Sequence, residues 1–273
     1  MADLNSMILA VTREGYHDRN AASRVCQDII LKAISASRFG DHITVKGGVV
    51  MRGITGNVRR ATQDVDLDFI RYSLDDDSIR RFIDRLNCID GIRIRISAPI
   101  EELSQQEYHG KRVFVTIEDD TGHSLHSKID LGVHKHVEIE QDEYCFDICM
   151  DDEGASLLIN SKEQMFAEKL RSLLRFGPLS TRYKDVFDLL WLSEHTDTGR
   201  LYQCIHTYIL TDSGMKERTM HDIHQRMKQT FENKTYRQRL ERSANVNWLN
   251  VGSVEAMERI LAYLLQMNQY EER

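Results

Sequence analysis

Residues 64–69 alternate strictly between aspartate and a large apolar side chain, in the order Asp-Val-Asp-Leu-Asp-Phe. Successive side chains of a β-strand point to opposite faces, so the alternation predicts a strand with one buried apolar face and three carboxylates on the other. Two carboxylates about 6–7 Å apart repel by roughly 2.5 kcal/mol at an effective dielectric constant near 20. The strand is therefore either a solvated edge strand, whose charges oppose aggregation, or part of a site that holds a cation.

A pair of glycines precedes this strand. Residues 42–48 read as a short strand that ends in Gly47 and Gly48, and residues 49–54 read as a brief helix. Glycine allows backbone N–H groups to approach a phosphate closely, and the N-terminus of a helix favours negative charge. A phosphate-binding turn beside carboxylates is what metal-dependent nucleotidyl transfer requires, because hard oxygen ligands hold Mg²⁺ or Mn²⁺.

A further carboxylate fits the same scheme. In residues 127–133, Ser-Lys-Ile-Asp-Leu-Gly-Val, alternation places Lys128 and Asp130 on one face and the apolar side chains on the other. On a strand next to residues 64–69, Asp130 would complete a three-carboxylate site with Asp64 and Asp66. It could then activate the attacking hydroxyl group.

At these residues the chain resembles a known family. The glycine pair, the helix after it and the run Arg60-x-Thr62-x-Asp64-x-Asp66 are similar to the polymerase-beta-like nucleotidyltransferase superfamily. Within it, the chain resembles the AbiEii/AbiGii-type nucleotidyltransferase toxins. Residues 167–192, where AEKLRSLLRF is followed by RYKDVFDLLWL, are similar to the second conserved block of that family.

The resemblance implies a role for each matching residue. The residues implied to bind the nucleoside triphosphate (NTP) are Gly47, Gly48, Arg60, Thr62 and Lys169. The residues implied to bind the divalent metal are Asp64 and Asp66, with Asp130 as the third carboxylate. The catalytic set is then Asp64, Asp66, Asp130, Lys169 and Asp185.

Plainer alternatives stay open for three of these residues and for the neighbouring Asp188. Arg60 either touches phosphate or braces the aspartates. Lys169 lies beside the apolar stripe of its predicted helix, so it either reaches into a cleft or is an ordinary surface lysine. Asp185 and Asp188 lie near a helix start, where the helix dipole favours acidic residues in any case.

The fold class expected is α+β, with two domains. The resemblance implies a polymerase-beta-like nucleotidyltransferase core, a mixed sheet with flanking helices, over residues 1–155. Residues 156–273 are expected to form a C-terminal helical domain that completes the active-site cleft.

The predicted strands are 42–48, 64–72, 92–98, 111–119, 125–134 and 144–150. The predicted helices are 18–40, 49–54, 73–87, 162–176, 181–195, 199–210, 213–233 and 253–270. Ser73 and Ser161 are the predicted N-caps of the helices that follow them.

The charge is unevenly distributed along the chain. The net charge of −7 argues against tight, non-specific nucleic-acid binding. Residues 162–242, however, contain 15 Lys and Arg against 11 Asp and Glu, and within them residues 216–242 contain 8 against 4. This region is either a solvated helix surface or one that holds a phosphate backbone locally.

The sequence predicts a cytoplasmic protein without a membrane segment. It has no apolar run of about 18 residues, and its N-terminus lacks the pattern of a secretion signal. Five scattered cysteines, an odd number, are most simply reduced thiols.

The resemblance implies a Mg²⁺-dependent transfer of a nucleoside monophosphate from an NTP to an acceptor hydroxyl, with release of pyrophosphate. The implied acceptor is the 3′ end of a tRNA, and the implied role is the toxin of a toxin–antitoxin or phage-defence system, with a cognate antitoxin protein as partner. Two alternatives remain: a nucleotidyltransferase that modifies a small molecule or a protein, and a non-catalytic nucleotide-binding relative.

Overall fold

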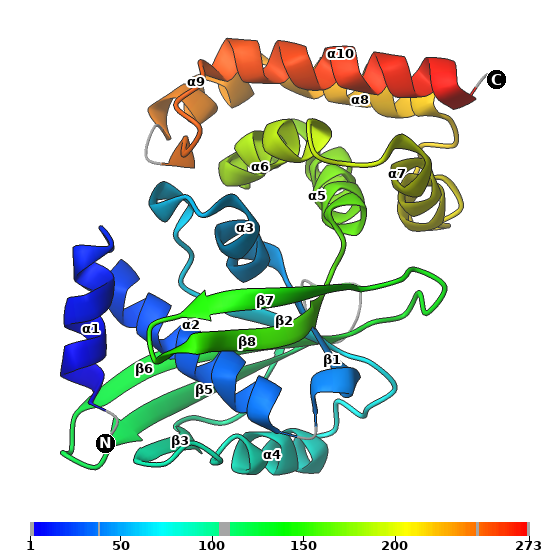
Figure 1. The fold of residues 1–273 in the computed structure, drawn as a ribbon. Helices are drawn as coiled ribbons and strands as arrows, with labels where there is room; N and C mark the ends of the chain where they lie inside the picture. Colours follow the sequence, from blue (N-terminus) through cyan, green and yellow to red (C-terminus); the bar gives the residue numbers. More distant parts are fainter. Residues whose placement is uncertain (1–2, 38, 104–109, 244–245, 272–273) are drawn as a thin grey trace. The chain divides into compact units, whose positions relative to one another are not determined.

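The computed structural model describes residues 3–37, 39–103, 110–243 and 246–271 (Figure 1). The chain divides into two compact units, Met1–Asn160 and Ser161–Arg273. The first is built on a mixed β-sheet with flanking helices and the second on helices, which confirms the predicted fold class. Within the described ranges, no helix combines the length and apolar character that a membrane span needs.

The described residues of the first unit form a sheet of eight strands in the order β3–β5–β6–β2–β1–β8–β7, with β4 paired to β5. The strands are β1 (Ile43–Lys46), β2 (Val65–Phe69), β3 (Ile92–Ile96), β4 (Glu101–Leu103), β5 (Gly110–Asp119), β6 (Ser124–Val133), β7 (Asp142–Ile148) and β8 (Asp151–Ile159). The central strand β2 runs parallel to β6 and antiparallel to β1. Strand β2 is thus paired on both edges and is not the solvated edge strand that alternation alone allowed.

Helices flank the sheet of the first unit. They are α1 (Leu4–Arg13), α2 (Asp18–Ala36), α3 (Gly47–Thr55) and α4 (Asp76–Arg85), with the short 3₁₀ turns η1 (Gly40–His42) and η2 (Val58–Arg60). Helix α2 packs against β6, β7 and β8, α3 packs against β1 and β2, and α4 packs against β3.

The apolar face of β2 forms part of the core. Val65, Leu67 and Phe69 are all fully buried, as the alternation predicts. The ring of Phe69 meets those of Tyr72 and Phe82 edge to face, with ring centroids 5.0 and 5.3 Å apart. Edge-to-face aromatic pairs at this separation are favourable, so the cluster ties β2 to α4.

Some elements of the first unit differ from the sequence expectation. Strands β4 and β8 and helix α1 were not predicted. Helix α4 is capped by Asp75, whose Oδ1 accepts a hydrogen bond from the backbone N–H of Ser78 at 2.7 Å, and not by Ser73. The hydroxyl group of Ser73 instead donates to Asp75, which explains why the cap lies two residues later than predicted.

The second unit contains α5 (Lys162–Phe176), η3 (Gly177–Leu179), α6 (Tyr183–Ser193), α7 (Thr198–Ile205), the π-helical segment η4 (His206–Leu210), α8 (Met220–Glu232), α9 (Lys234–Arg242) and α10 (Ser253–Glu271). The predicted cap of α5 is confirmed, since Ser161 Oγ accepts from the backbone N–H of Gln164 at 3.1 Å. Helix α10 packs against α6 and α8, and α5 packs against α6 and α7.

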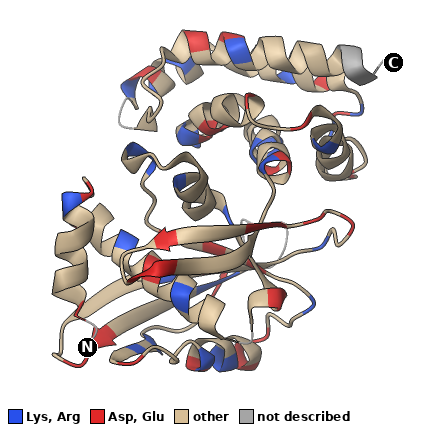
Figure 2. Cartoon of the chain, in the orientation of Figure 1, with Lys and Arg blue, Asp and Glu red and all other residues tan. Residues whose placement is uncertain are grey.

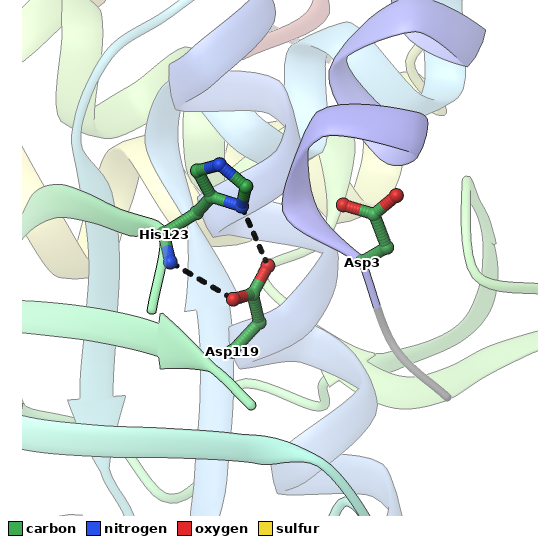
Figure 3. Close-up of side chains that lie close together, drawn as sticks. All are labelled: Asp3, Asp119 and His123. Atoms are coloured by element: carbon green, nitrogen blue, oxygen red, sulfur yellow. Dashed lines mark hydrogen bonds and ion pairs between the residues drawn. The ribbon is translucent and has the colours of Figure 1, made fainter. Parts of the chain in front are cut away.

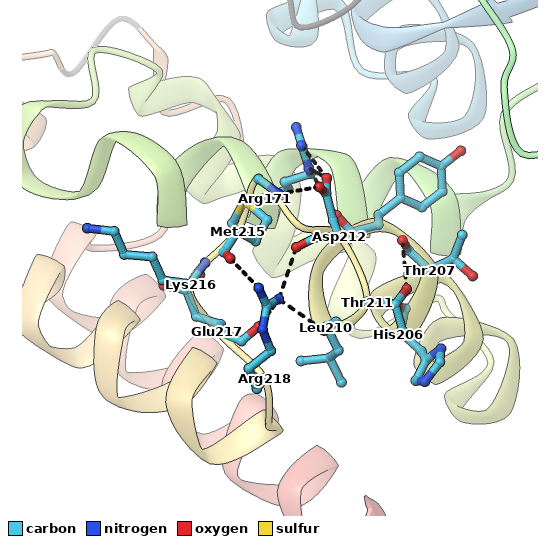
Figure 4. Close-up of polar contacts among 12 residues, drawn as sticks. Arg171, His206, Thr207, Leu210, Thr211, Asp212, Met215, Lys216, Glu217 and Arg218 are labelled. Atoms are coloured by element: carbon cyan, nitrogen blue, oxygen red, sulfur yellow. Dashed lines mark hydrogen bonds and ion pairs between the residues drawn. The ribbon is translucent and has the colours of Figure 1, made fainter.

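The helix predicted from residue 213 is wrong over its first turns, because α8 begins at Met220. A capping box sets this start: Thr219 Oγ1 accepts from the N–H of Asp222, and the Asp222 carboxylate accepts from the N–H of Thr219. The segment before it is held by Arg218, whose guanidinium donates to the carbonyl oxygens of Leu210, Asp212 and Met215 (Figure 4). These carbonyl groups therefore accept hydrogen bonds from a side chain and not from the backbone N–H groups of a helix.

Replacing Thr219 with alanine removes one half of the capping box. We expect the free energy of unfolding of the second unit to fall by about 1 kcal/mol, the usual value of an N-cap. Urea denaturation followed by far-UV circular dichroism measures the change. The exposed Thr198, in the first turn of α7, supplies the control, and an equal loss in Thr198→Ala would show that the capping box contributes nothing specific.

Candidate active site

The two glycines lie where β1 passes directly into α3. Lys46 ends the strand, and Gly47 begins the helix with φ +68°, a left-handed conformation that favours glycine. A Cβ atom built on Gly47 would lie 2.4 Å from Oδ2 of Asp66, and one on Gly48 would lie 2.4 Å from Oγ1 of Thr62. Both glycines are therefore required for the close approach of the segment that carries the candidate site residues.

The structure places two of the predicted carboxylates on adjacent strands in register. Asp66 on β2 pairs with Asp130 on β6, and neighbouring strands lie about 4.8 Å apart. Lys46 on β1 is opposite Asp66 on its other side. Asp64 immediately precedes β2 and is half-buried. The polar face of the sheet thus carries carboxylates beside the N-terminus of α3, where backbone N–H groups favour an anion.

Basic side chains compensate the charge of these carboxylates. Arg112 on β5 forms a bidentate pair with Asp130, with Nε–Oδ1 and Nη2–Oδ2 distances of 2.7 and 2.8 Å. This hydrogen bonding raises the pKa of the Arg112 guanidinium. Lys128 Nζ lies 3.1 Å from Oδ1 of Asp64. The chain therefore provides its own counterions at the candidate site.

The third aspartate of the alternation has a different environment. Asp68 is 5% exposed, and its Oδ1 lies 2.6 Å from Nζ of Lys46. A Cβ atom built on Gly132 of β6 would lie 2.2 Å from this same oxygen. Asp68 is thus enclosed between β1 and β6, and Gly132 leaves the space for its carboxylate.

The donor chemistry of the candidate site fits a divalent cation, since Asp64, Asp66 and Asp130 offer the hard oxygen ligands that Mg²⁺ takes. Their oxygens do not, however, gather within 4.8 Å of one another in the structure. Among the described residues, three ligand atoms come that close at Asp3, Asp119 and His123 (Figure 3).

The cluster in Figure 3 is explained by the fold. One oxygen of Asp119 accepts from the backbone N–H of Leu4 at 3.0 Å, and the other accepts from those of Thr121 and His123 at 3.0 Å each. The hydroxyl group of Thr121 and these N–H groups hold the pKa of Asp119 well below its usual range. The Asp119 carboxylate thus closes the turn between β5 and β6 and anchors the start of α1.

Arg60 is also enclosed. It ends the short turn η2 and is 2% exposed. Arg60 is expected from the sequence either to touch a phosphate or to brace the aspartates. Its burial agrees better with the second role, in which it supports the segment before β2. Thr62 in the same segment is half-buried, and its carbonyl oxygen accepts from Nε2 of Gln27 on α2 at 2.9 Å.

The second unit brings its predicted residues together in a buried ion network. Lys169 Nζ on α5 lies 2.9 Å from Oδ1 of Asp185 and 2.8 Å from Oδ2 of Asp188, both on α6. The side chain of Lys169 is only 7% exposed, so the surface-lysine alternative is wrong. Asp188 is completely buried, and its Oδ1 accepts from Nε1 of Trp248 at 2.9 Å. It is a core residue of this network and not a helix-start acid.

Arg182 completes the network. Its Nε lies 2.6 Å from Oδ2 of Asp185. Burial opposes the ionisation of Asp185, but the positive charges of Lys169 and Arg182 outweigh it, and the pKa of this carboxyl group is lowered. The sequence pattern alone does not identify Arg182, Arg112 or Lys46 as partners of these carboxylates. Arg182 is the first residue of the block RYKDVFDLLWL and lies three residues before Asp185, a position that could have drawn attention to it.

Replacing Lys169 with methionine leaves the buried carboxylates of Asp185 and Asp188 without this cation. Breaking a buried ion pair in this way costs about 3–5 kcal/mol, so we expect a comparable fall in the free energy of unfolding. Lys228→Met is the control, because Lys228 pairs with Glu232 at the surface at 3.9 Å, where a pair contributes at most about 1 kcal/mol. Equal losses in urea denaturation would contradict the structural role of Lys169.

Known proteins are similar to this chain in sequence and in fold. The model of the AbiEii family, described as the nucleotidyl transferase toxin of a type IV toxin–antitoxin system, matches residues 29–248. The fold is similar to the crystal structure of an H. pylori protein assigned as a nucleotidyltransferase, with a TM-score of 0.51 and 14% identity over 92% of this chain and 95% of that chain. An antigenic nucleotidyltransferase-like protein from Paracoccidioides brasiliensis gives a TM-score of 0.46 and 13% identity, over 81% of this chain and 92% of that chain. None of the curated proteins compared with the chain matches it.

At such identities the likeness to the H. pylori structure shows the fold alone. The family match also shows which family the chain belongs to, because it includes both sequence blocks and spans most of the chain. The protein is therefore a member of the AbiEii family, the nucleotidyl transferase toxins of type IV toxin–antitoxin systems.

Proposed function

We propose that this toxin transfers a nucleoside monophosphate from an NTP to the 3′ end of a tRNA in a reaction that depends on Mg²⁺ or Mn²⁺. The observation that carries the proposal is the contact geometry at the start of α3. Gly47 lies against the carboxylate of Asp66, and Asp66 lies in register with Asp130. A turn suited to phosphate therefore adjoins a pair of carboxylates.

In this proposal the residues of the first unit have different roles. Backbone N–H groups at Gly47 and Gly48 bind the triphosphate, and Asp64, Asp66 and Asp130 would hold the cation. When bound, the cation neutralises the triphosphate and favours the departure of pyrophosphate. Asp130 has a second candidate role, the acceptance of the proton of the attacking hydroxyl group, for which its pair with Arg112 fixes its orientation.

The acceptor is proposed from charge. Helices α8 and α9 carry several Lys and Arg residues, which are blue in the cartoon of Figure 2. Those with exposed side chains are Lys228, Lys234, Arg239 and Arg242. Such a surface attracts a phosphate backbone without reading its sequence. A type IV toxin also implies an antitoxin as its partner.

Asp66→Ala should abolish the transfer while the protein keeps its fold. We expect a loss greater than the roughly 10–100-fold that removal of an outer-shell partner of a metal costs. The assay incubates the protein with Mg²⁺, total tRNA and each α-labelled NTP in turn, and follows label entering the RNA. Omission of the divalent cation should have the same effect as the substitution.

The control is Asp84→Ala, which removes an exposed carboxylate on α4. Activity that survives in Asp66→Ala would contradict the metal assignment. Label that enters a small molecule or a protein but no RNA would contradict the tRNA acceptor and leave the nucleotidyl transfer itself standing.

Gly47→Ala and Gly56→Ala form a matched pair for the phosphate turn. Both glycines have positive φ, +68° and +59°, so each alanine costs about 1–2 kcal/mol of backbone strain. Only at Gly47 does the new methyl group meet Asp66, whereas the space around Gly56 is open. We expect Gly47→Ala to reduce the transfer rate at least about tenfold more than Gly56→Ala at similar melting temperatures. Equal activity in the two variants would contradict the role of this turn.

A further inference from the structure

The ion network of the second unit presents one of its cations to solvent. The side chains of Lys169, Asp185 and Asp188 are 7%, 6% and 0% exposed, whereas that of Arg182 is 58% exposed. Two negative charges and one positive charge therefore lie inside the unit, and a second positive charge lies at its surface. Burying charges in this way is costly, and replacement of such networks by apolar residues is often neutral or stabilising. Stability alone is therefore a weak reason for this arrangement.

The geometry gives the two cations different capacities. The ammonium group of Lys169 is desolvated and contacts two carboxylates, so a phosphate would have to reach it through the protein and compete with both. The guanidinium of Arg182 is anchored through Nε, on the side that faces Asp185. A planar guanidinium binds phosphate oxygens in a fixed fork, and anchoring it in advance reduces the entropy lost on binding.

We propose that Arg182 binds a phosphate group of the substrate and that Asp185, held by Lys169, is the residue that positions it. The inference rests on the proposed nucleotidyl transfer and assigns the phosphate contact of the second unit to Arg182 in place of Lys169. The phosphate belongs either to the NTP or to the backbone of the acceptor RNA. Both present the same oxyanion chemistry.

Arg182→Gln tests the contact in the full chain. Each NTP with Mg²⁺ and no RNA is titrated by calorimetry, and tRNA binding is measured separately over a range of salt concentrations. If the phosphate is that of the NTP, its Kd should rise about tenfold, the usual loss for a hydrogen bond to a charged group, with tRNA binding unchanged. If it belongs to the RNA, NTP binding should be unchanged and the salt dependence of tRNA binding should lose about one phosphate contact.

The control is Arg259→Gln on α10. Arg259 is 45% exposed and also pairs with carboxylates, those of Glu194 and Glu255. Arg182→Lys, which keeps the charge and loses the fork, should recover part of the affinity. Asp185→Asn should weaken binding of the same ligand, and combining it with Arg182→Gln should add little, because the two residues act as one unit. A purely structural role would instead lower the melting temperature and leave the ligand preference unchanged.

Two results would overturn the inference, and they are distinguishable. If the wild-type protein binds NTP or tRNA and Arg182→Gln binds both as Arg259→Gln does, the phosphate contact of Arg182 is wrong and the proposed function stands. If the wild-type protein binds neither ligand, the proposed function itself fails, and the role of Arg182 fails with it.

Discussion

The pairing of strand β2 determines how the sheet of the first unit is arranged, because one face of this strand is apolar and the other is acidic. Val65, Leu67 and Phe69 are fully buried on one side, and the aspartates occupy the other. A slip of one residue in pairing would turn the carboxylates into the apolar core and the apolar side chains out of it. The register of β2 with β1 and β6 is therefore specified strongly, and it is this register that sets Asp66 beside Asp130.

The second unit depends on a comparable constraint made of charges. The Asp188 carboxylate, fully buried, joins the ammonium group of Lys169 on α5 to the indole of Trp248, 60 residues further along the chain. A buried carboxylate accepts few alternative arrangements, because any loss of a partner leaves an uncompensated charge. The network thus selects one packing of α5 and α6 and fixes the side chains at the start of α6.

Sequence patterns predict most elements here, because alternation and helical periodicity are local. They place Asp130 on a strand but do not show that this strand pairs with β2, and the family resemblance points to Lys169 and Asp185. They do not show which cations meet these carboxylates. Arg112 meets Asp130 only through the register of the β5–β6 pairing, and Lys46 reaches Asp68 only because Gly132 leaves room on the adjacent strand. Likewise, the start of α8 depends on hydrogen bonds from Arg218 to carbonyl groups up to eight residues away. These bonds compete with helix formation before Met220, and helical periodicity in the sequence does not reveal them.

The pairing of the carboxylates with basic side chains has a consequence for the folded state itself. Asp64, Asp68 and Asp130 are matched by Lys128, Lys46 and Arg112, so these six side chains sum to zero charge without any ligand. The sheet can therefore carry closely spaced acids without the repulsion that an acidic cluster alone would impose. A ligand that binds Asp64 and Asp130 exchanges their basic partners for itself, and its affinity therefore depends on the difference between the two sets of counterions. Removing one of these basic residues, or reversing its charge, would thus change the free energy of unfolding and the affinity for the ligand in opposite directions. The polar face of the sheet therefore couples folding to ligand binding.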